Sequence, residues 1–186
     1  MGVVLGLVAG GKVSNLAHAR LRGEWLLFIA LVLQALLPTV RSAGVARDVV
    51  YSVWLGSFFV LLAVCLANCR HPGLSIAGVG MLLNTVVIAL NGGMPVAAEA
   101  LTVVKGTFAS GLSSTDFAHV VLTAATRAAA LADVMPVPGP TWLRSIASAG
   151  DLMLCCGVAT YVAYAMRTLP VVARSSDAGL SVSVAK

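Results

Sequence analysis

Charged side chains are scarce in this sequence. Only 10% of its residues are Asp, Glu, Lys or Arg, whereas 59% are hydrophobic. A typical soluble domain has ~25% charged residues, so this chain has too few of them to cover a globular surface with charge. The composition therefore excludes an ordinary soluble domain, and a length of 186 residues suits one compact helical bundle.

The sequence also lacks the motifs of soluble enzymes. It contains no Walker loop, no HExxH and no dinucleotide-binding fingerprint. Its four cysteines form no CxxC pair and lie in or at the end of apolar runs, which argues against a disulfide scaffold. Cys65, Cys69 and His71 lie close together, but cysteine commonly serves as a small apolar residue in a membrane helix. We therefore predict no metal site and no cofactor.

Long apolar runs are what the sequence has in abundance, at residues 25–40, 49–67, 74–90 and 152–166. A helix that rises ~1.5 Å per residue needs about 20 residues to cross a hydrocarbon core ~30 Å thick. We predict an all-α integral membrane bundle with four transmembrane helices, in which residues 1–170 form a single domain in the lipid bilayer. The polar tail at residues 171–186 is expected to be disordered and cytoplasmic.

A shorter apolar piece at residues 1–11 has glycines at a spacing of four, namely Gly2, Gly6 and Gly10. It is too short to cross a bilayer as an ideal helix. Glycines at this spacing form a groove without side chains, which lets another helix backbone approach closely. We predict a short Gly-rich helix that packs against other helices, with a membrane-protein partner or a homo-oligomer as possible settings.

The basic residues predict the orientation. Lys and Arg stand in short clusters beside the apolar runs, so the net charge of +5 indicates membrane topology rather than a nucleic-acid partner. With the loop of Lys12, Arg20 and Arg22 in the cytoplasm, alternation of the spans places Arg70 and the C-terminus there as well. The N-terminus and residues 91–151 then lie outside.

Residues 117–134 contain Arg127 and Asp133, each of which would cost ~2.5–3.5 kcal/mol at the centre of a membrane helix. Polar residues recur there at helical spacing on one stripe, from Asp116 through His119 and Thr123 to Arg127. We predict an amphipathic helix on the outer face or lining a cavity. A capping box at residues 113–116 would start it, and the prolines at 136 and 138 would end it.

Two asparagines face the same way from one predicted helix, because Asn84 and Asn91 are seven residues apart. Asn84 lies deep, where an unpaired amide costs several kcal/mol. It either forms an interhelical hydrogen bond, with Gln34 as a candidate, or belongs to a ligand or ion pathway. The next residues form either a helix cap and turn or an irregular loop that lines a cavity; they are Asn91, Gly92, Gly93, Met94 and Pro95.

Three ionisable residues near the outer face could carry chemistry. His119 follows Asp116 by one turn of a helix, so it could bind a metal, shuttle a proton or simply be solvated. The run S-A-G-D at 148–151 partly matches the GxGD motif of intramembrane aspartyl enzymes, with Asp133 as the partner carboxylate. The first glycine of that motif is missing, which favours Asp151 as a cap at the positive end of a helix dipole. We assign no catalytic residue.

Four short motifs mark the chain: G-G-K-V-S-N-L at 10–16, N-G-G-M-P-V at 91–96, D-V-M-P at 133–136 and S-A-G-D at 148–151. Together they resemble a family of small bacterial multi-span proteins, the domain of unknown function 5317. The resemblance runs from about residue 5 to residue 166, and N-G-G-M-P is its most distinctive part. It implies a multi-span architecture in a bacterial inner membrane, with a first helix that is shortened at its start here, and it implies no activity.

These observations favour a non-enzymatic binding or accessory protein of the bacterial plasma membrane, one that holds a small amphiphilic ligand or packs into a complex. The alternative is a small transporter or membrane enzyme with a polar site near the outer face. That site would gather the candidate residues Asn84, Asn91, His119, Asp133 and Asp151.

Overall fold

The computed structural model describes residues 1–105, 112–113, 115–140 and 144–168. As the sequence predicted, the described chain is mostly helical, and four of its helices are long and apolar enough to cross a membrane. They are α2 (Glu24–Ser42), α3 (Arg47–Ala67), α4 (Leu74–Asn91) and α6 (Ala149–Arg167). A short helix, α1 (Gly2–Val8), and a 3₁₀ helix, η1 (Val13–His18), precede them. The predicted tail at 171–186 lies outside the described residues.

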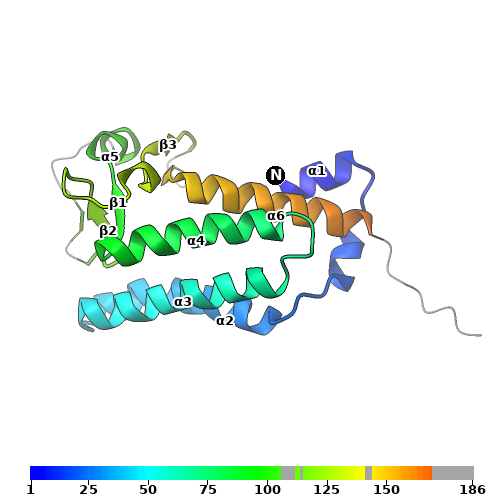
Figure 1. Ribbon diagram of the computed structural model, residues 1–186, viewed down its shortest axis with the longest axis horizontal. Helices are drawn as coiled ribbons and strands as arrows, with labels where there is room; N and C mark the ends of the chain where they lie inside the picture. Colours follow the sequence, from blue (N-terminus) through cyan, green and yellow to red (C-terminus); the bar gives the residue numbers. More distant parts are fainter. Residues whose placement is uncertain (106–111, 114, 141–143, 169–186) are drawn as a thin grey trace, which may run out of the picture.

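The long helices pack in the spatial order α2, α3, α4, α6, and α1 packs on α6 (Figure 1). The contact between α4 and α6 is the most extensive, whereas α2 and α6 share no extensive contact. One end of the bundle, here called the basic end, carries Lys12, Arg20, Arg22, Arg70 and Arg167. The opposite end is here called the capped end.

The capped end is built from the short elements between α4 and α6 (Figure 1): β1 (Met94–Val96), α5 (Ala98–Lys105), β2 (His119–Val121), the 3₁₀ helix η2 (Ala129–Leu131), β3 (Met135–Val137) and β4 (Ser145–Ala147). β1 pairs with β2 in parallel, and an isolated bridge joins Val96 to Asp133. β3 pairs with β4 antiparallel. These pairings place Asp133 close to the ends of both α4 and α6.

The amphipathic helix predicted over residues 117–134 is wrong, because the chain forms β2, a turn and η2 there. The carboxylate of Asp116 does accept hydrogen bonds from the backbone N–H groups of Ala118 (3.0 Å) and His119 (2.9 Å), as a helix cap would. The chain then continues extended, because Val120 and Val121 pair with β1. Pairing of β-branched residues with a distant strand thus outweighs the helix propensity of the alanines that follow.

Glycines bring α4 and α6 together along what we call the α4–α6 seam. A Cβ added at Gly80 would lie 2.7 Å from the backbone nitrogen of Leu154, and one at Gly157 would clash with the backbone of Gly73 and Ala77. Backbone atoms cannot move aside as the end of a side chain can. The seam therefore admits glycine alone at these positions, and its close approach gains the dispersion contacts that hold helices together in lipid.

The short helix α1 also uses glycines against α6. An added Cβ at Gly2 would meet the backbone of Ala159, and one at Gly6 would meet the side chain of Met166. Gly10 differs from the prediction, because α1 ends at Val8 and Gly10 lies in the following turn with a φ of 77°. An added Cβ there would have nothing within 4 Å. The contact surface of α1 is therefore made by two of the three glycines.

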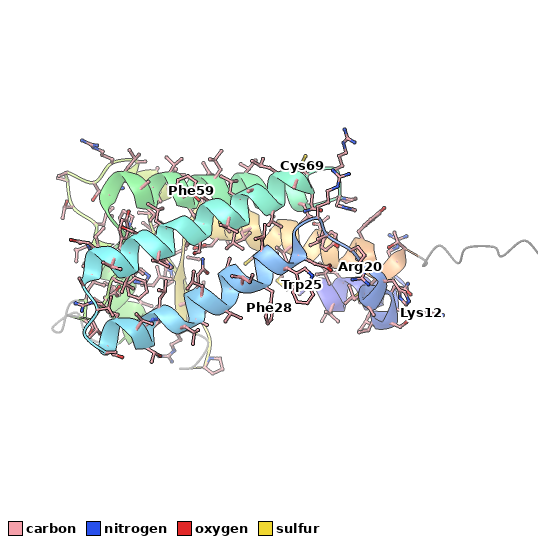
Figure 2. The ribbon with its side chains drawn as sticks, turned by 90° about the horizontal axis from the view of Figure 1, so that it is seen from below. Lys12, Arg20, Trp25, Phe28, Phe59 and Cys69 are labelled. Atoms are coloured by element: carbon pink, nitrogen blue, oxygen red, sulfur yellow. The ribbon has the colours of Figure 1, made fainter. Side chains whose placement is uncertain are left out.

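Large apolar side chains cover the outside of the long helices. Trp25 and Phe28 project from the outer face of α2 (Figure 2), with 73% and 59% of their surface exposed, and Phe59 of α3 is 55% exposed. A soluble protein seldom leaves so much apolar surface in water. These faces are suited to contact with lipid chains.

Candidate functional site

Polar side chains where α4 meets the start of α6 form a closed hydrogen-bond network. The Nδ2 of Asn84 donates to Asp151 Oδ1 (2.7 Å), and its Oδ1 accepts from the Ser148 hydroxyl (3.0 Å). Ser148 and Asp151 also form a capping box, in which each side chain accepts from the other residue's backbone N–H at 3.0 Å. Asp151 is therefore both the N3 residue of the capping box of α6 and the partner of Asn84.

Asn84 does form the predicted interhelical hydrogen bond, but its partner is Asp151 of α6, and the candidate partner Gln34 is wrong. Gln34 of α2 instead donates through Nε2 to the hydroxyl of Ser57 on α3, at 2.8 Å. α2 is the neighbour of α3 in the bundle, whereas the first turn of α6 lies directly against Asn84. Asn84 precedes the last residue of α4 by seven positions, or about 10 Å of helix. The network therefore lies well below the end of the bundle.

A cavity of about 390 Å³ opens beside this network. All four long helices line it, and its wall is mostly apolar, with Leu27, Phe58, Leu61, Met81 and Leu154 among the lining residues. Its polar groups are Gln34, Asn84 and Asp151. The cavity thus joins an apolar wall to a fixed set of hydrogen-bonding side chains.

Asp133, in the capped end, is a buried carboxyl with only 6% of its surface exposed. Its Oδ1 has no hydrogen-bond partner within the part of the chain that the structure describes. Burial and the neighbouring charge of Asp151 raise the pKa of Asp133 to about 7, and the charge of His119 opposes this shift. Asp133 is therefore poised to exchange a proton near neutral pH.

His119 pairs with Asp116, whose two carboxylate oxygens lie 3.1 Å from its Nδ1. Burial alone would raise the pKa of Asp116, but the hydrogen bonds and charge of His119 outweigh it and hold that pKa below its ordinary value. His119 therefore has a carboxylate partner at the rim of the capped end, and it also lies within electrostatic range of Asp133.

The run N-G-G-M-P ends α4 and leads into β1. Gly92 closes the helix in a left-handed conformation with a φ of 69°, and Arg47 donates to its carbonyl oxygen at 2.9 Å. Asn91 holds the backbone of Arg127 through two hydrogen bonds of 2.9 Å. An added Cβ at Gly93 would lie 3.0 Å from the side chain of Val120.

Pro95 is fully buried, and its carbonyl oxygen accepts from the N–H of Asp133 at 2.8 Å. Of the residues singled out from the sequence, Asn84 and Asp151 are thus in direct contact, and Asp133 and His119 lie within electrostatic range. Asn91, Gly92 and Gly93 instead form the turn between α4 and β1. Among the described residues, no three His, Cys, Asp or Glu side chains lie close enough to hold a metal ion.

Sequence reasoning missed the bond from Ser148 to Asn84 and the cavity itself. The spacing of Ser148 and Asp151 signals a capping box, so that part of the network could have been read from the sequence. Nothing in the sequence signals the cavity, because its presence depends on how the helices pack and on the lack of an extensive contact between α2 and α6.

Comparison with known proteins places the chain in a family. A protein of Thermotoga maritima, described as an uncharacterized protein, is 28% identical over 149 residues, which are 80% of this chain and 78% of that protein. No solved structure matches the chain significantly. The family model "Family of unknown function (DUF5317)" matches residues 18–163. Since that match covers most of the chain, the protein belongs to this family, the one that its sequence motifs resemble.

Proposed function

We propose that this protein is a multi-pass protein of the bacterial cytoplasmic membrane that binds an amphiphile in the cavity between its long helices. One observation carries the proposal: the cavity joins a wall of leucines and other apolar side chains to the polar network of Asn84, Ser148 and Asp151. Ligand sites typically combine an apolar lining with a few positioned polar groups. An amphiphile has the same division between chain and head.

A membrane setting is supported by the four long apolar helices and by their exposed aromatic side chains. The charges support an orientation with the basic end and the C-terminus in the cytoplasm. In the described part of the chain, five Lys or Arg residues and one carboxylate, Glu24, lie at the basic end. Five Lys or Arg residues and five carboxylates lie at the capped end: Arg41, Arg47, Lys105, Arg127, Arg144, Asp48, Glu99, Asp116, Asp133 and Asp151.

The absence of an extensive contact between α2 and α6 supports a route into the cavity from the side. Residues of both helices line it, with Leu27 and Leu31 on α2 and Leu154 and Val158 on α6. An aliphatic chain could enter between these side chains without leaving the hydrocarbon phase. Its head would then reach Asn84 and Asp151 in the outer half of the bilayer.

A photoreactive probe tests this proposal. The full chain is placed in phosphatidylcholine vesicles with a dodecyl alcohol that carries a diazirine on its chain, and labelled residues are mapped by mass spectrometry. We expect labelling of the cavity-lining residues of α2, α3 and α6. Leu154→Trp, which fills the cavity, is expected to reduce that labelling about tenfold, because the chain loses most of its buried apolar contact.

Leu152→Trp is the matched control, because Leu152 lies on the same helix with 49% of its surface exposed and does not line the cavity. It should leave cavity labelling unchanged. Labelling confined to outward-facing residues such as Phe28 and Phe59, and equal in both variants, would overturn the proposal.

A transporter or membrane enzyme with a polar outer site is the second candidate, and Asp133 is the observation that favours it. Ionisable groups with strongly shifted pKa values cluster at sites of proton transfer and catalysis. Uptake of protons by vesicles, driven by an imposed pH gradient and lost in Asp133→Asn, would support this candidate. Equal uptake by vesicles with and without the protein would remove proton transport.

A further inference from the structure

Among the described residues that line the cavity between the long helices there is one carboxylate and no cationic side chain. Asp151 is that carboxylate, and none of the described residues that line the cavity is Lys, Arg or His. The other polar groups in the wall are the amides of Gln34 and Asn84, which are neutral. An occupant therefore meets a negative charge in an apolar surrounding.

Asp151 keeps acceptor capacity that the protein does not use. An ionised carboxylate offers about four lone-pair positions. The bonds from Asn84 Nδ2 (2.7 Å) and from the Ser148 N–H (3.0 Å) occupy one position on each oxygen. Both donors are neutral, and Asp151 forms no ion pair with the described residues. A donor on the ligand therefore finds unused acceptor positions on this carboxylate.

The position of the network strengthens this electrostatic preference. Asn84 lies seven residues before the end of α4, about 10 Å along the helix axis. Attraction between opposite charges rises as the effective dielectric constant falls below that of water. A cation placed beside Asp151 would thus be held more firmly than one beside a carboxylate on the surface.

We infer that the cavity binds a single-chain amphiphile with a primary ammonium head group. The inference rests on the proposed function and adds the chemical class of the ligand. The ammonium would donate to Asp151, and Gln34, which donates through Nε2 to Ser57, offers its Oε1 as a further acceptor in the same cavity. A volume of about 390 Å³ lies near the lower end of the ~300–1,000 Å³ typical of ligand sites, which suits one aliphatic chain.

Other head groups fit the cavity less well. A phosphate, sulfate or carboxylate head would face the like charge of Asp151, and the described lining residues offer no Arg or Lys to bind it. A hydroxyl head can donate one hydrogen bond to Asp151 but brings no compensating charge. The expected order of binding is ammonium, then hydroxyl, then sulfate.

Three probes that share one diazirine-bearing dodecyl chain and differ only in the head test this order. The heads are a primary ammonium, a hydroxyl and a sulfate, and the full chain is labelled in phosphatidylcholine vesicles at about pH 6. We expect the ammonium probe to label the cavity residues about tenfold more than the hydroxyl probe, as a charge-assisted hydrogen bond would give. The sulfate probe should label them least.

Asp151→Asn removes the charge but keeps a side chain that can cap α6, so it should reduce the preference for ammonium to below about twofold. Asp48→Asn is the matched control, because Asp48 is an exposed carboxylate at the same end of the bundle, and it should leave the preference unchanged. The preference of the unaltered protein does not depend on how well either variant folds.

The outcomes separate the two proposals. Equal labelling of the cavity by all three probes in the unaltered protein overturns the ammonium head but leaves amphiphile binding in place. A preference that persists in Asp151→Asn also overturns the inference, because the charge would then come from elsewhere. No labelling of the cavity by any probe overturns the proposed function itself.

Discussion

The two sides of α6, here called its flanks, differ in how closely they pack against the neighbouring helix, and residue size accounts for the difference. On one flank, Gly80 of α4 and Gly157 of α6 bring two backbones into contact along the α4–α6 seam. On the other flank, leucines of α2 and α6 line a cavity of about 390 Å³. The same helix is therefore fixed on one side and accessible on the other.

The fixed flank holds the polar wall of the open one. Gly150 lies so close to Asn84 that an added Cβ would clash with the amide, and Asn84 in turn bonds to Asp151 and Ser148. A larger residue at Gly150 would displace the network from the cavity wall. The seam thus positions the hydrogen-bonding groups that the cavity presents.

The largest effect is expected at the seam itself. Gly157→Leu should destabilise the protein by about 3 kcal/mol or more, because the new side chain meets backbone atoms of Gly73 and Ala77, which cannot move aside. The measurement is chemical unfolding in detergent micelles. Gly56→Leu is the matched control on α3, where an added Cβ has nothing within 4 Å, and it should change the stability by less than about 1 kcal/mol. Similar losses in both variants would show that the seam is not tightly packed.

The buried carboxyl of Asp133, in the capped end, should make the stability of the protein depend on pH. Its pKa of about 7 in the folded protein lies above the ordinary value of 3.8, so the folded state binds the proton more tightly than the unfolded state. The contribution of Asp133 to stability is therefore most favourable below about pH 4 and becomes less favourable as the pH rises to about 7. Asp133→Asn, which is neutral at every pH, should be more stable than the unaltered protein at pH 8, by about 2–4 kcal/mol.

The advantage of Asp133→Asn should shrink steadily as the pH is lowered, and it should vanish near pH 4. Unfolding midpoints measured across this range give the test. Asp48→Asn serves as the control, because Asp48 is exposed and should show no such trend. A difference between Asp133→Asn and the unaltered protein that is the same at pH 8 and at pH 4 would contradict a buried, proton-binding Asp133.

Substitutions in the hydrogen-bond network of Asn84, Ser148 and Asp151 should have an intermediate effect on stability. Asn84→Leu removes the donor to Asp151 Oδ1 and the acceptor of the Ser148 hydroxyl, and the loss of a hydrogen bond to a charged group costs about 1.5–3 kcal/mol. Gln34→Leu removes only the neutral bond to Ser57, for which about 0.6 kcal/mol is typical in membrane proteins. Unfolding of both variants in the same detergent compares them directly. An equal cost would mean that the charge of Asp151 does not strengthen its bond to Asn84.

The long helices were predictable because the apolar composition of each one is visible in its own sequence. Residues 49–67 hold no charge, and no tertiary information is needed to see that such a run forms a long apolar helix. The cap of α6 was predictable for the same reason, because Ser148 and Asp151 lie three residues apart. Family membership followed from short motifs such as N-G-G-M-P.

The errors arose where a distant segment decides the local outcome. The alanines of residues 117–134 favour a helix, but Val120 and Val121 instead pair in parallel with β1, which lies 25 residues earlier in the chain. Asn84 needed a partner, yet the sequence gives no distance that would choose Ser148 and Asp151 over Gln34. The burial of Asp133 likewise depends on its bridge to Val96, which no local pattern foretells.

Gly6, in the contact between α1 and α6, should tolerate substitution better than Gly157, although both glycines pack against a neighbouring helix. At Gly6 the obstructing group is the sulfur of Met166, the far end of a flexible side chain, and not backbone as in the α4–α6 seam. Gly6→Leu should therefore cost only about 1 kcal/mol, because methionine adapts its shape readily. Val8→Leu, at an 84% exposed position of the same helix, is the control and should cost nothing measurable. A loss in Gly6→Leu as large as that in Gly157→Leu would mean that α1 is fixed as rigidly as α4. In that case the flexibility of the obstructing atom would not explain why one helix contact tolerates a larger residue and another does not.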